Sequence, residues 1–242
     1  TDSTNSYLTR ISSEKKLPDG TVVITGKQEQ GRGQRGTFWE SEPGKNLTFS
    51  ILLHPAFLKP DEQFLLSKAV AVAVADFVKQ HTPNPPDKKP GQDSQKANVK
   101  VKWPNDIYIG NKKAAGILIE NSVSGNSLSQ SIVGIGINVN QEKFSSDLLN
   151  PTSLKLITGK EFDLDECLAG ICSCIESKYL HLKQNNFSKT NMEYLKNLYR
   201  FEEWANYSYK GEIIKARITG VTKIGQLILE KENEERLECD VK

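Results

Sequence analysis

The stretch VKVKWPNDIYIGNKKAAGILIE, residues 99–120, decides the fold class. Apolar residues alternate with polar ones before Pro104 and again before Gly110, which is the period-2 pattern of β-strands. Proline cannot donate to a strand ladder, and Gly110-Asn111 is a turn pair, so each of them ends a strand. We therefore predict an antiparallel meander of short strands here, continued by a further strand in SIVGIGINVN at 131–140.

Strand and helix patterns also occur outside this meander. TVVITG (21–26) predicts a short buried strand, and LTFSILLH (47–54) predicts another. A capped helix is expected near the N-terminus, where Ser3 or Thr4 can satisfy free backbone amides. Apolar residues recur at helical spacing in three more segments, 61–80, 163–184 and 191–204. The sequence therefore predicts an α+β fold with a mixed, largely antiparallel sheet packed with helices.

The pattern changes after about Asn206, where short strands alternate with glycine turns, as in small β-barrels. We predict a large domain over 1–200 and a small β-rich domain over 201–242. A unit of roughly 40 residues buries too little to fold with confidence alone, so it is expected to pack on the larger domain. Residues 81–98 are rich in Pro, Lys, Asp and Gln, which predicts a mobile surface loop.

Composition excludes several classes of protein. The 242 residues are 37% hydrophobic and 26% charged, which suits a soluble globular chain. No apolar run approaches the ~20 residues that a membrane helix needs. A formal net charge of +2 gives no field that implies nucleic-acid binding. The four cysteines form no C-x-x-C pair, so we expect incidental or structural thiols in a reducing cytoplasm rather than a metal site.

The segment GRGQRGTFW at 31–39 contains the spacing G-x-G-x-x-G. A dinucleotide-binding fingerprint needs a helix directly after this loop, but the turn SEPGKN and a predicted strand follow instead. Glycine lets backbone amides approach a ligand, and the guanidinium groups of Arg32 and Arg35 suit phosphate or carboxylate. We interpret the segment as a flexible loop that folds over an anion. A solvated basic hairpin tip is the alternative.

A second set of polar residues lies at the ends of the predicted meander strands. Lys102, Asn105 and Asp106 suit a triphosphate with Mg²⁺, which favours one or two carboxylates together with phosphate oxygens. Across the Gly110 turn, Lys112 and Lys113 bring positive charges back toward the same edge. An ordinary charged hairpin is the alternative. Asn138 ends a strand in which Gly134 and Gly136 leave one face bare, so a ligand can approach its backbone.

In combination, these motifs resemble the biotin protein ligases, also called biotin–[acetyl-CoA-carboxylase] ligases. The matching pieces, in the family's order, are DSTN at 2–5, GRGQRG at 31–36, KWPNDIY at 102–108, KKAAGILIE at 112–120 and VGIGINVN at 133–140. The resemblance is strong over about the first 140 residues and weaker for the tail. It implies a class II synthetase-like catalytic domain followed by a small SH3-like domain.

The resemblance also implies a two-step activity with MgATP. Biotin is first activated to biotinyl-5′-AMP and is then transferred to a lysine of a biotin carboxyl carrier protein. The resemblance assigns catalytic roles to Lys113, Arg32 and Lys102, and it assigns Mg²⁺ binding to Asn105 and Asp106. Biotin would be bound by Ser3, Thr4, Asn5, Gln28, Arg32, Gly33, Gln34 and Lys113. ATP or the adenylate would be bound by Arg32, Arg35, Trp39, Lys102, Asn105 and Asn138.

The sequence departs from the family pattern at two places. Gln34 stands where the family often has arginine and Thr37 where it has a basic residue, so we expect weaker retention of the adenylate. Some members carry an N-terminal helix-turn-helix and repress transcription. Here the motifs start at residue 2, so we expect no DNA-binding domain and no repressor activity, unless some 60 or more residues precede this sequence in the native chain. A homodimer is a further hypothesis from the family.

Two other functions stay open at this point. A lipoate–protein ligase shares the fold and the adenylate chemistry, although KWPND and the compact glycine loop fit the biotin branch better. A non-catalytic biotin or nucleotide sensor is the second alternative. Lys102, Asp106 and Lys113 speak against it, because a sensor does not need a set of groups for metal and phosphate.

Overall fold

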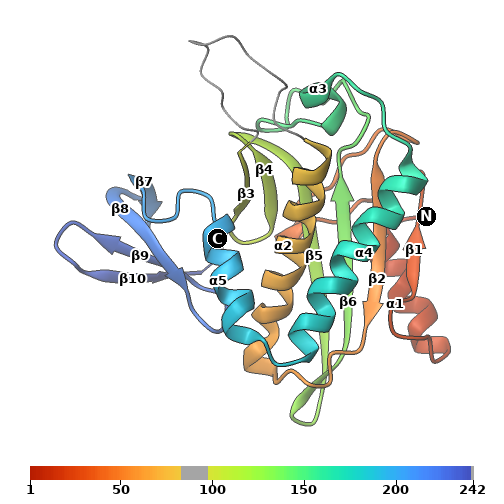
Figure 1. The fold of residues 1–242 in the computed structure, drawn as a ribbon, viewed down its shortest axis with the longest axis horizontal. Coiled ribbons are helices and arrows are strands. Elements are labelled where there is room, and N and C mark those ends of the chain that lie inside the picture. Colours follow the sequence, from red (N-terminus) through yellow and green to blue (C-terminus); the bar gives the residue numbers. More distant parts are fainter. Residues whose placement is uncertain (83–97, 241–242) are drawn as a thin grey trace.

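The computed structural model describes residues 1–82 and 98–240. Its main element is a six-stranded antiparallel sheet in the order β1-β2-β6-β5-β4-β3 (Figure 1). The strands β3, β4, β5 and β6 follow one another as antiparallel neighbours, so the predicted meander is confirmed. The strand bounds are β1 (Val22–Ile24), β2 (Leu47–Leu53), β3 (Val99–Lys102), β4 (Asp106–Ile109), β5 (Lys112–Ser124) and β6 (Ser127–Ile137).

Alternation along β2 and β6 gives the sheet two different faces. Leu47, Phe49 and Ile51 of β2 belong to the main hydrophobic core. Leu52, on the opposite face, belongs with Leu8 to a small separate cluster. Since successive side chains point to opposite faces, Thr48 and Ser50 lie on the same face as Leu52. One face of the sheet is therefore apolar and covered by helices, and the other carries polar residues and glycines.

The apolar face is covered by α2 (Gln63–His81) and α4 (Leu164–Lys183), which pack on each other as well as on the sheet (Figure 1). The helix α5 (Phe187–Asn197) adds a further contact with α2. Because α2 is enclosed by sheet and helices, its residues are buried nearly all round, including Lys68 at 5% exposure. The short helix α3 (Leu154–Thr158), which the sequence pattern did not predict, follows β6.

The opposite face is partly covered by α1 (Thr4–Glu14), which contacts β2 and β6. Ser3 is the N-cap of this helix, and its side chain accepts a hydrogen bond from the backbone N–H of Ser6. The prediction of a capped N-terminal helix is therefore confirmed. The cap places the first turn of α1 against the middle of the sheet.

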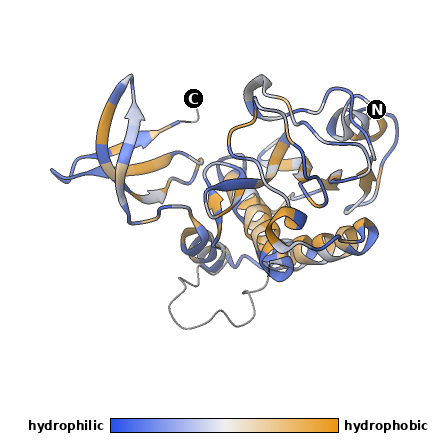
Figure 2. Ribbon diagram, turned by 90° about the horizontal axis from the view of Figure 1, so that it is seen from above, coloured by the Kyte–Doolittle hydropathy of each residue, from blue (hydrophilic) through white to orange (hydrophobic). Residues whose placement is uncertain are grey.

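A second, smaller antiparallel sheet lies near the C-terminus and forms a lobe of its own in the view from above (Figure 2). It joins the main body through a hydrogen bond from Trp103 Nε1 to the carbonyl of Gly225 (2.8 Å) and an ion pair between Lys223 and Asp61 (2.6 Å). The lobe therefore packs on the larger unit, as expected. Its strands are β7 (Trp204–Tyr209), β8 (Glu212–Val221), β9 (Leu227–Lys231) and β10 (Arg236–Cys239).

Two details of the prediction are wrong. The strand β1 is an edge strand whose Val22 and Ile24 are 38% and 47% exposed, so it is not buried. The helix expected to run to Trp204 ends at Asn197, because Arg200 and Glu202 adopt positive φ angles and the chain turns into β7. The surface loop predicted at 81–98 lies, apart from its first two residues and its last, outside the described residues.

Candidate active site

A cavity of about 380 Å³ lies on the polar face of the sheet, opposite α2 and α4. It is enclosed by the start of α1, the glycine loop at 31–39, the β3–β4 turn, and the middle of β5 and β6. Its lining comprises Ser3, Thr4, Asn5, Gln28, Arg32, Gly33, Gln34, Thr37, Phe38, Trp39, Thr48, Asn105, Asp106, Lys113, Gly116, Ile117, Leu118, Gly134, Ile135 and Gly136. Eleven sequence-predicted site residues are among them.

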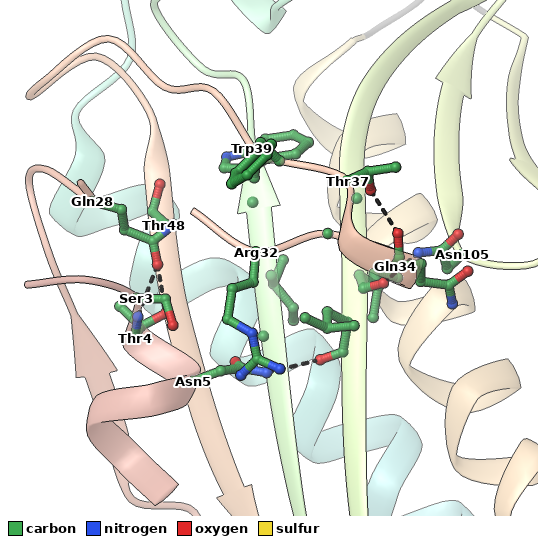
Figure 3. A pocket seen from close by; sticks show the side chains of 18 of the residues that line it. Ser3, Thr4, Asn5, Gln28, Arg32, Gln34, Thr37, Trp39, Thr48 and Asn105 are labelled. Carbon is green, nitrogen blue, oxygen red and sulfur yellow. Dashed lines mark hydrogen bonds between the residues drawn. The ribbon is translucent and has the colours of Figure 1, made fainter. Parts of the chain in front are cut away.

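One wall of the pocket is a network of polar side chains around the first turn of α1 (Figure 3). Gln28 Oε1 accepts hydrogen bonds from the backbone N–H of Thr4 (2.8 Å) and from its hydroxyl (3.3 Å). Ser50 donates its hydroxyl proton to Asn5 Oδ1 (2.6 Å), and its oxygen lies within hydrogen-bond distance of Thr4 Oγ1 (2.7 Å). These contacts fix the direction in which each amide and hydroxyl faces the cavity.

The glycine loop forms a tight hairpin over the pocket. Arg32 and Phe38 form an antiparallel bridge, and the backbone N–H of Trp39 donates to the carbonyl of Gly31 (2.9 Å). A Cβ at Gly31 would overlap that hairpin backbone, so the tight closure requires glycine. Only a three-residue 3₁₀ turn, η1 (Gln34–Gly36), occurs within the loop. The expected absence of a dinucleotide-binding helix after these glycines is confirmed.

Trp39 at the end of the loop lies directly on the bare strands. A Cβ at Gly136 would overlap its indole, and one at Gly116 would come within 3.1 Å of Cζ3. Gly116 of β5 and Gly136 of β6 therefore make room for this side chain rather than leaving an open surface. The indole Nε1 is buried and has no hydrogen-bond partner in the described structure.

Lys113 lies on β5 with its ammonium 5.7 Å from the centre of the Trp39 ring. Its Nζ also forms an ion pair with Asp106 Oδ1 at 2.7 Å. The side chain of Asn105 donates from Nδ2 to the backbone carbonyl of Ile117. The backbone carbonyl of Asn105 accepts from the backbone N–H of Ile117 (3.0 Å). The β3–β4 turn is thus tied to β5, and its polar side chains are held at the pocket.

Glu120 is a residue of the site that the sequence analysis did not single out. Its carboxylate receives two hydrogen bonds from Arg32, from Nη2 at 2.6 Å and from Nη1 at 3.2 Å. It also accepts a bond from Asn5 Nδ2 at 2.8 Å. Its position two residues after Leu118, on the pocket side of β5, is the signal that could have identified it.

Three of the predicted site residues are not among the described side chains that line the pocket. Lys102 lies outside the pocket lining, with its Nζ 3.1 Å from the hydroxyl of Tyr108, in a separate groove of about 930 Å³. Asn138 is buried and donates to the carbonyl of Thr152 (2.9 Å), so its amide N–H is used by the protein's own backbone. Arg35 lies in the 3₁₀ turn η1, and its side chain is outside the described part of the structure.

Neither a thiol centre nor a built-in metal cluster competes with this pocket as a site. Within residues 1–82 and 98–240 no three His, Cys, Asp or Glu side chains converge as a metal would require. Cys167, Cys172 and Cys174 form no disulfide, and burial raises the pKa of the Cys167 thiol to about 11, so it stays protonated at neutral pH. Nor does any helix of these residues have the length and hydropathy of a membrane span.

The sheet, backed by helices on one face and carrying a polar pocket with two charged Arg and Lys side chains on the other, defines an α+β domain with a cavity of small-molecule size. Comparison with known proteins gives the family. The sequence profile of the biotin/lipoate A/B protein ligase family matches residues 1–138, which is more than half of the chain. The chain therefore belongs to this family.

Individual relatives agree with that assignment. The bifunctional ligase/repressor BirA of Bacillus subtilis (strain 168) is 32% identical over 180 residues, which are 73% of this chain and 51% of the relative. The biotin--[acetyl-CoA-carboxylase] ligase of Paracoccus denitrificans is 31% identical over 141 residues, which are 57% and 52% of the two chains. The chain spans about half the length of the curated relatives it matches.

Solved structures extend the similarity to the whole chain. The biotin protein ligase from Aquifex aeolicus, in complex with biotin and ATP, superposes with a TM-score of 0.76 at 26% identity. The superposition covers 98% of this chain and 91% of that one. Because this coverage includes the C-terminal strands, the small sheet belongs to the shared fold.

Proposed function

We propose that the protein is a biotin protein ligase. The observation that carries the proposal is the convergence of Lys113, from β5, and Arg32, from the glycine loop, on one pocket that also holds the polar wall of α1. A carboxylate and a polyphosphate repel each other, so an enzyme that joins them needs cations between them. The pocket supplies these cations beside a polar recognition wall.

The pocket volume supports a small-molecule substrate. About 380 Å³ falls in the range of roughly 300–1,000 Å³ that is usual for ligand pockets. We assign the ureido end of biotin to the side of Ser3, Thr4, Asn5 and Gln28, where hydroxyl and amide groups are held in fixed directions. The carboxylate of biotin then points toward the cations.

In the first step, a carboxylate oxygen of biotin attacks the α-phosphorus of ATP. A new P–O bond forms, the bond to the β-phosphate bridging oxygen breaks, and pyrophosphate leaves with that electron pair. Lys113 is placed to stabilise the charge on the reacting oxygens, and the Trp39 indole offers a face for stacking of the adenine. Closure of the glycine loop keeps water from the mixed anhydride.

The pocket contains oxygen donors that suit a magnesium ion. Asp106 provides a carboxylate in the pocket lining, next to the amide of Asn105, and Mg²⁺ is commonly held by one or two carboxylates plus substrate phosphates. When bound with ATP, the ion would neutralise phosphate charge. The ion pair of Asp106 with Lys113 ties the same carboxylate to the reacting end of the pocket.

In the second step, the neutral amine of an acceptor lysine attacks the acyl carbon of biotinyl-5′-AMP. The amide bond forms, AMP leaves with the electrons of the C–O bond, and the amine proton is released. The acceptor we propose is a biotin carboxyl carrier protein. The Paracoccus relative, whose name includes acetyl-CoA-carboxylase, supports this choice.

Two alternatives are less favoured. The matched family includes lipoate ligases, but the Paracoccus relative and the Aquifex aeolicus structure carry the names of biotin ligases. A sensor without catalysis would not need Lys113 and Asp106 together in the pocket. Pyrophosphate release separates these functions. We expect release on mixing the protein with biotin and MgATP but not with lipoate and MgATP. The proposal would be rejected if pyrophosphate were released with lipoate but not with biotin, or if it were released with neither of the two acids.

The assembly and the compartment are proposed on separate grounds. Among the described strands β1 pairs only with β2, so one edge of the main sheet is open to a second copy of the chain. We propose a homodimer, which sedimentation with and without biotinyl-5′-AMP tests. The absence of a disulfide at Cys167, Cys172 and Cys174 supports the proposal of a reducing cytoplasm.

A further inference from the structure

Glu120 joins three parts of the pocket that are distant in the sequence. It lies on β5, receives a bidentate pair of hydrogen bonds from Arg32 of the glycine loop, and accepts another from Asn5 of α1. Arg32 and Asn5 both line the pocket, whereas Glu120 is not part of the lining. The carboxylate therefore acts on a ligand through its two neighbours.

Asn5 has little freedom because of these contacts. Its Oδ1 accepts from Ser50 (2.6 Å), and a Cβ at Gly134 would overlap that same atom. Its Nδ2 donates to Glu120 at 2.8 Å and, over a longer 3.4 Å, to the carbonyl of Leu118. At 3% exposure this amide is buried, so losing Glu120 leaves it with only the longer of these two hydrogen bonds.

Arg32 ties the first half of the glycine loop to the sheet, whereas the end of the loop is held by the packing of Trp39 on Gly116 and Gly136. Within the loop, hydrogen bonds run between neighbours such as Gly31 and Trp39, and these bonds shape the hairpin without attaching it to the strands. The guanidinium of Arg32 reaches across to β5, and a bidentate fork fixes direction as well as distance. The ion pair thereby sets how closely the loop lies over the pocket.

The geometry points to Glu120 as a positioning residue that clasps the glycine loop over the pocket and orients Asn5. This inference rests on the proposed function for its kinetic consequences, but the clasp itself is a property of the ligand-free protein. Two N–H groups of Arg32 point to the carboxylate, and its remaining N–H groups can still face a substrate anion. Glu120 therefore cooperates with the ligand instead of competing with it for Arg32.

Replacing Glu120 by glutamine tests the clasp, because the amide keeps the shape but loses the charge and turns a donor toward Arg32 or Asn5. Hydrogen exchange of the ligand-free protein is the first measurement. In Glu120→Gln we expect the amides of 31–39 to exchange at least tenfold faster than in the wild type. Glu230→Gln is the matched control, since it removes the charge from another Arg–Glu pair, in the C-terminal sheet, where two N–H groups of Arg217 donate to Glu230 Oε1.

Kinetics supply the second measurement. We expect the KM for biotin to rise about tenfold in Glu120→Gln, with kcat for pyrophosphate release within about threefold of the wild type. Glu120→Asp keeps the charge, so its KM for biotin should lie between those of Glu120→Gln and the wild type. Unchanged exchange at 31–39, or tighter biotin binding in Glu120→Gln, would overturn the inference. If the wild type releases no pyrophosphate, the proposed function fails, whereas the exchange result still decides the clasp.

Discussion

The ammonium of Lys113 lies 2.7 Å from a carboxylate oxygen of Asp106, and both side chains line the pocket. Arg32, the other described cation of the lining, is likewise paired with a carboxylate, that of Glu120. Each cation is therefore held in place before a substrate arrives. Such preorganisation lowers the cost of placing charge where it is needed in the transition state.

Replacing Lys113 by methionine should lower the rate of biotinyl-5′-AMP formation by roughly 10²-fold or more, by analogy with the loss of a preorganised donor. The methionine keeps most of the side-chain volume but removes the charge and leaves Asp106 without its partner. Pyrophosphate release in single-turnover experiments measures the effect. The neighbouring Lys112 is exposed, so Lys112→Met should retain wild-type rates. Equal losses in the two variants would contradict a specific role for Lys113.

Replacing Gly136 by alanine should displace Trp39, because a Cβ there overlaps the indole. We expect the KM for ATP to rise roughly tenfold, equivalent to about 1.4 kcal/mol. Gly220→Ala is the control, since a Cβ at that buried strand position would meet only Ile228 at an ordinary 3.5 Å. The assignment of Trp39 to the nucleotide fails if both variants keep the wild-type KM.

Replacing Gln34 by arginine should reduce leakage of the activated intermediate. Gln34 lines the pocket at the turn of the glycine loop, where its carbonyl accepts from the backbone and side chain of Thr37. An arginine here adds a cation that can hold the adenylate phosphate. Free biotinyl-5′-AMP in the medium, measured without acceptor protein, should fall in Gln34→Arg. Equal release from both proteins would show that this position does not control retention.

The stability of the protein should depend on pH through Lys68. Burial among Phe64 and Tyr194 lowers its pKa from 10.5 to about 8. Because the folded-state pKa is the lower one, the unfolded chain binds more protons between pH 8 and 10.5. The free energy of unfolding therefore rises across this window, by up to about 3 kcal/mol from this group.

Denaturant unfolding of wild type and Lys68→Met at pH 7 and pH 10 isolates this effect. The methionine variant has no proton to lose at this position, so its stability relative to the wild type should be greatest at pH 7 and should shrink as the pH rises. A constant difference between the two proteins over this window would show that Lys68 keeps its ordinary pKa.

Local patterns were sufficient to predict much of the fold. Alternation around Pro104 and Gly110 identified the meander, and helical spacing identified α2 and α4. The failures arose where local pattern and tertiary position differ. The strand β1 has apolar residues but lies at the sheet edge, and the pattern after α5 is interrupted by backbone turns at Arg200 and Glu202.

The site was predictable where a motif carries its own chemistry, as the glycine loop and Lys113 do. Glu120 was missed because its partner, Arg32, is 88 residues away in the sequence, and only pairing of the strands brings the two together. Lys102 remains a predicted site residue that lies apart from this pocket. It belongs to the same motif as Asp106, but the end of β3 leaves its ammonium beside Tyr108 and outside the pocket lining.

The most direct test of biotin ligation is the intact mass of a biotin carboxyl carrier domain after incubation with this protein, biotin and MgATP. We predict a gain of one biotinyl group on a single lysine, which disappears when ATP is omitted or when Lys113→Met replaces the wild type. An unmodified carrier domain, or a carrier domain that gains mass with lipoate but not with biotin, would contradict the account.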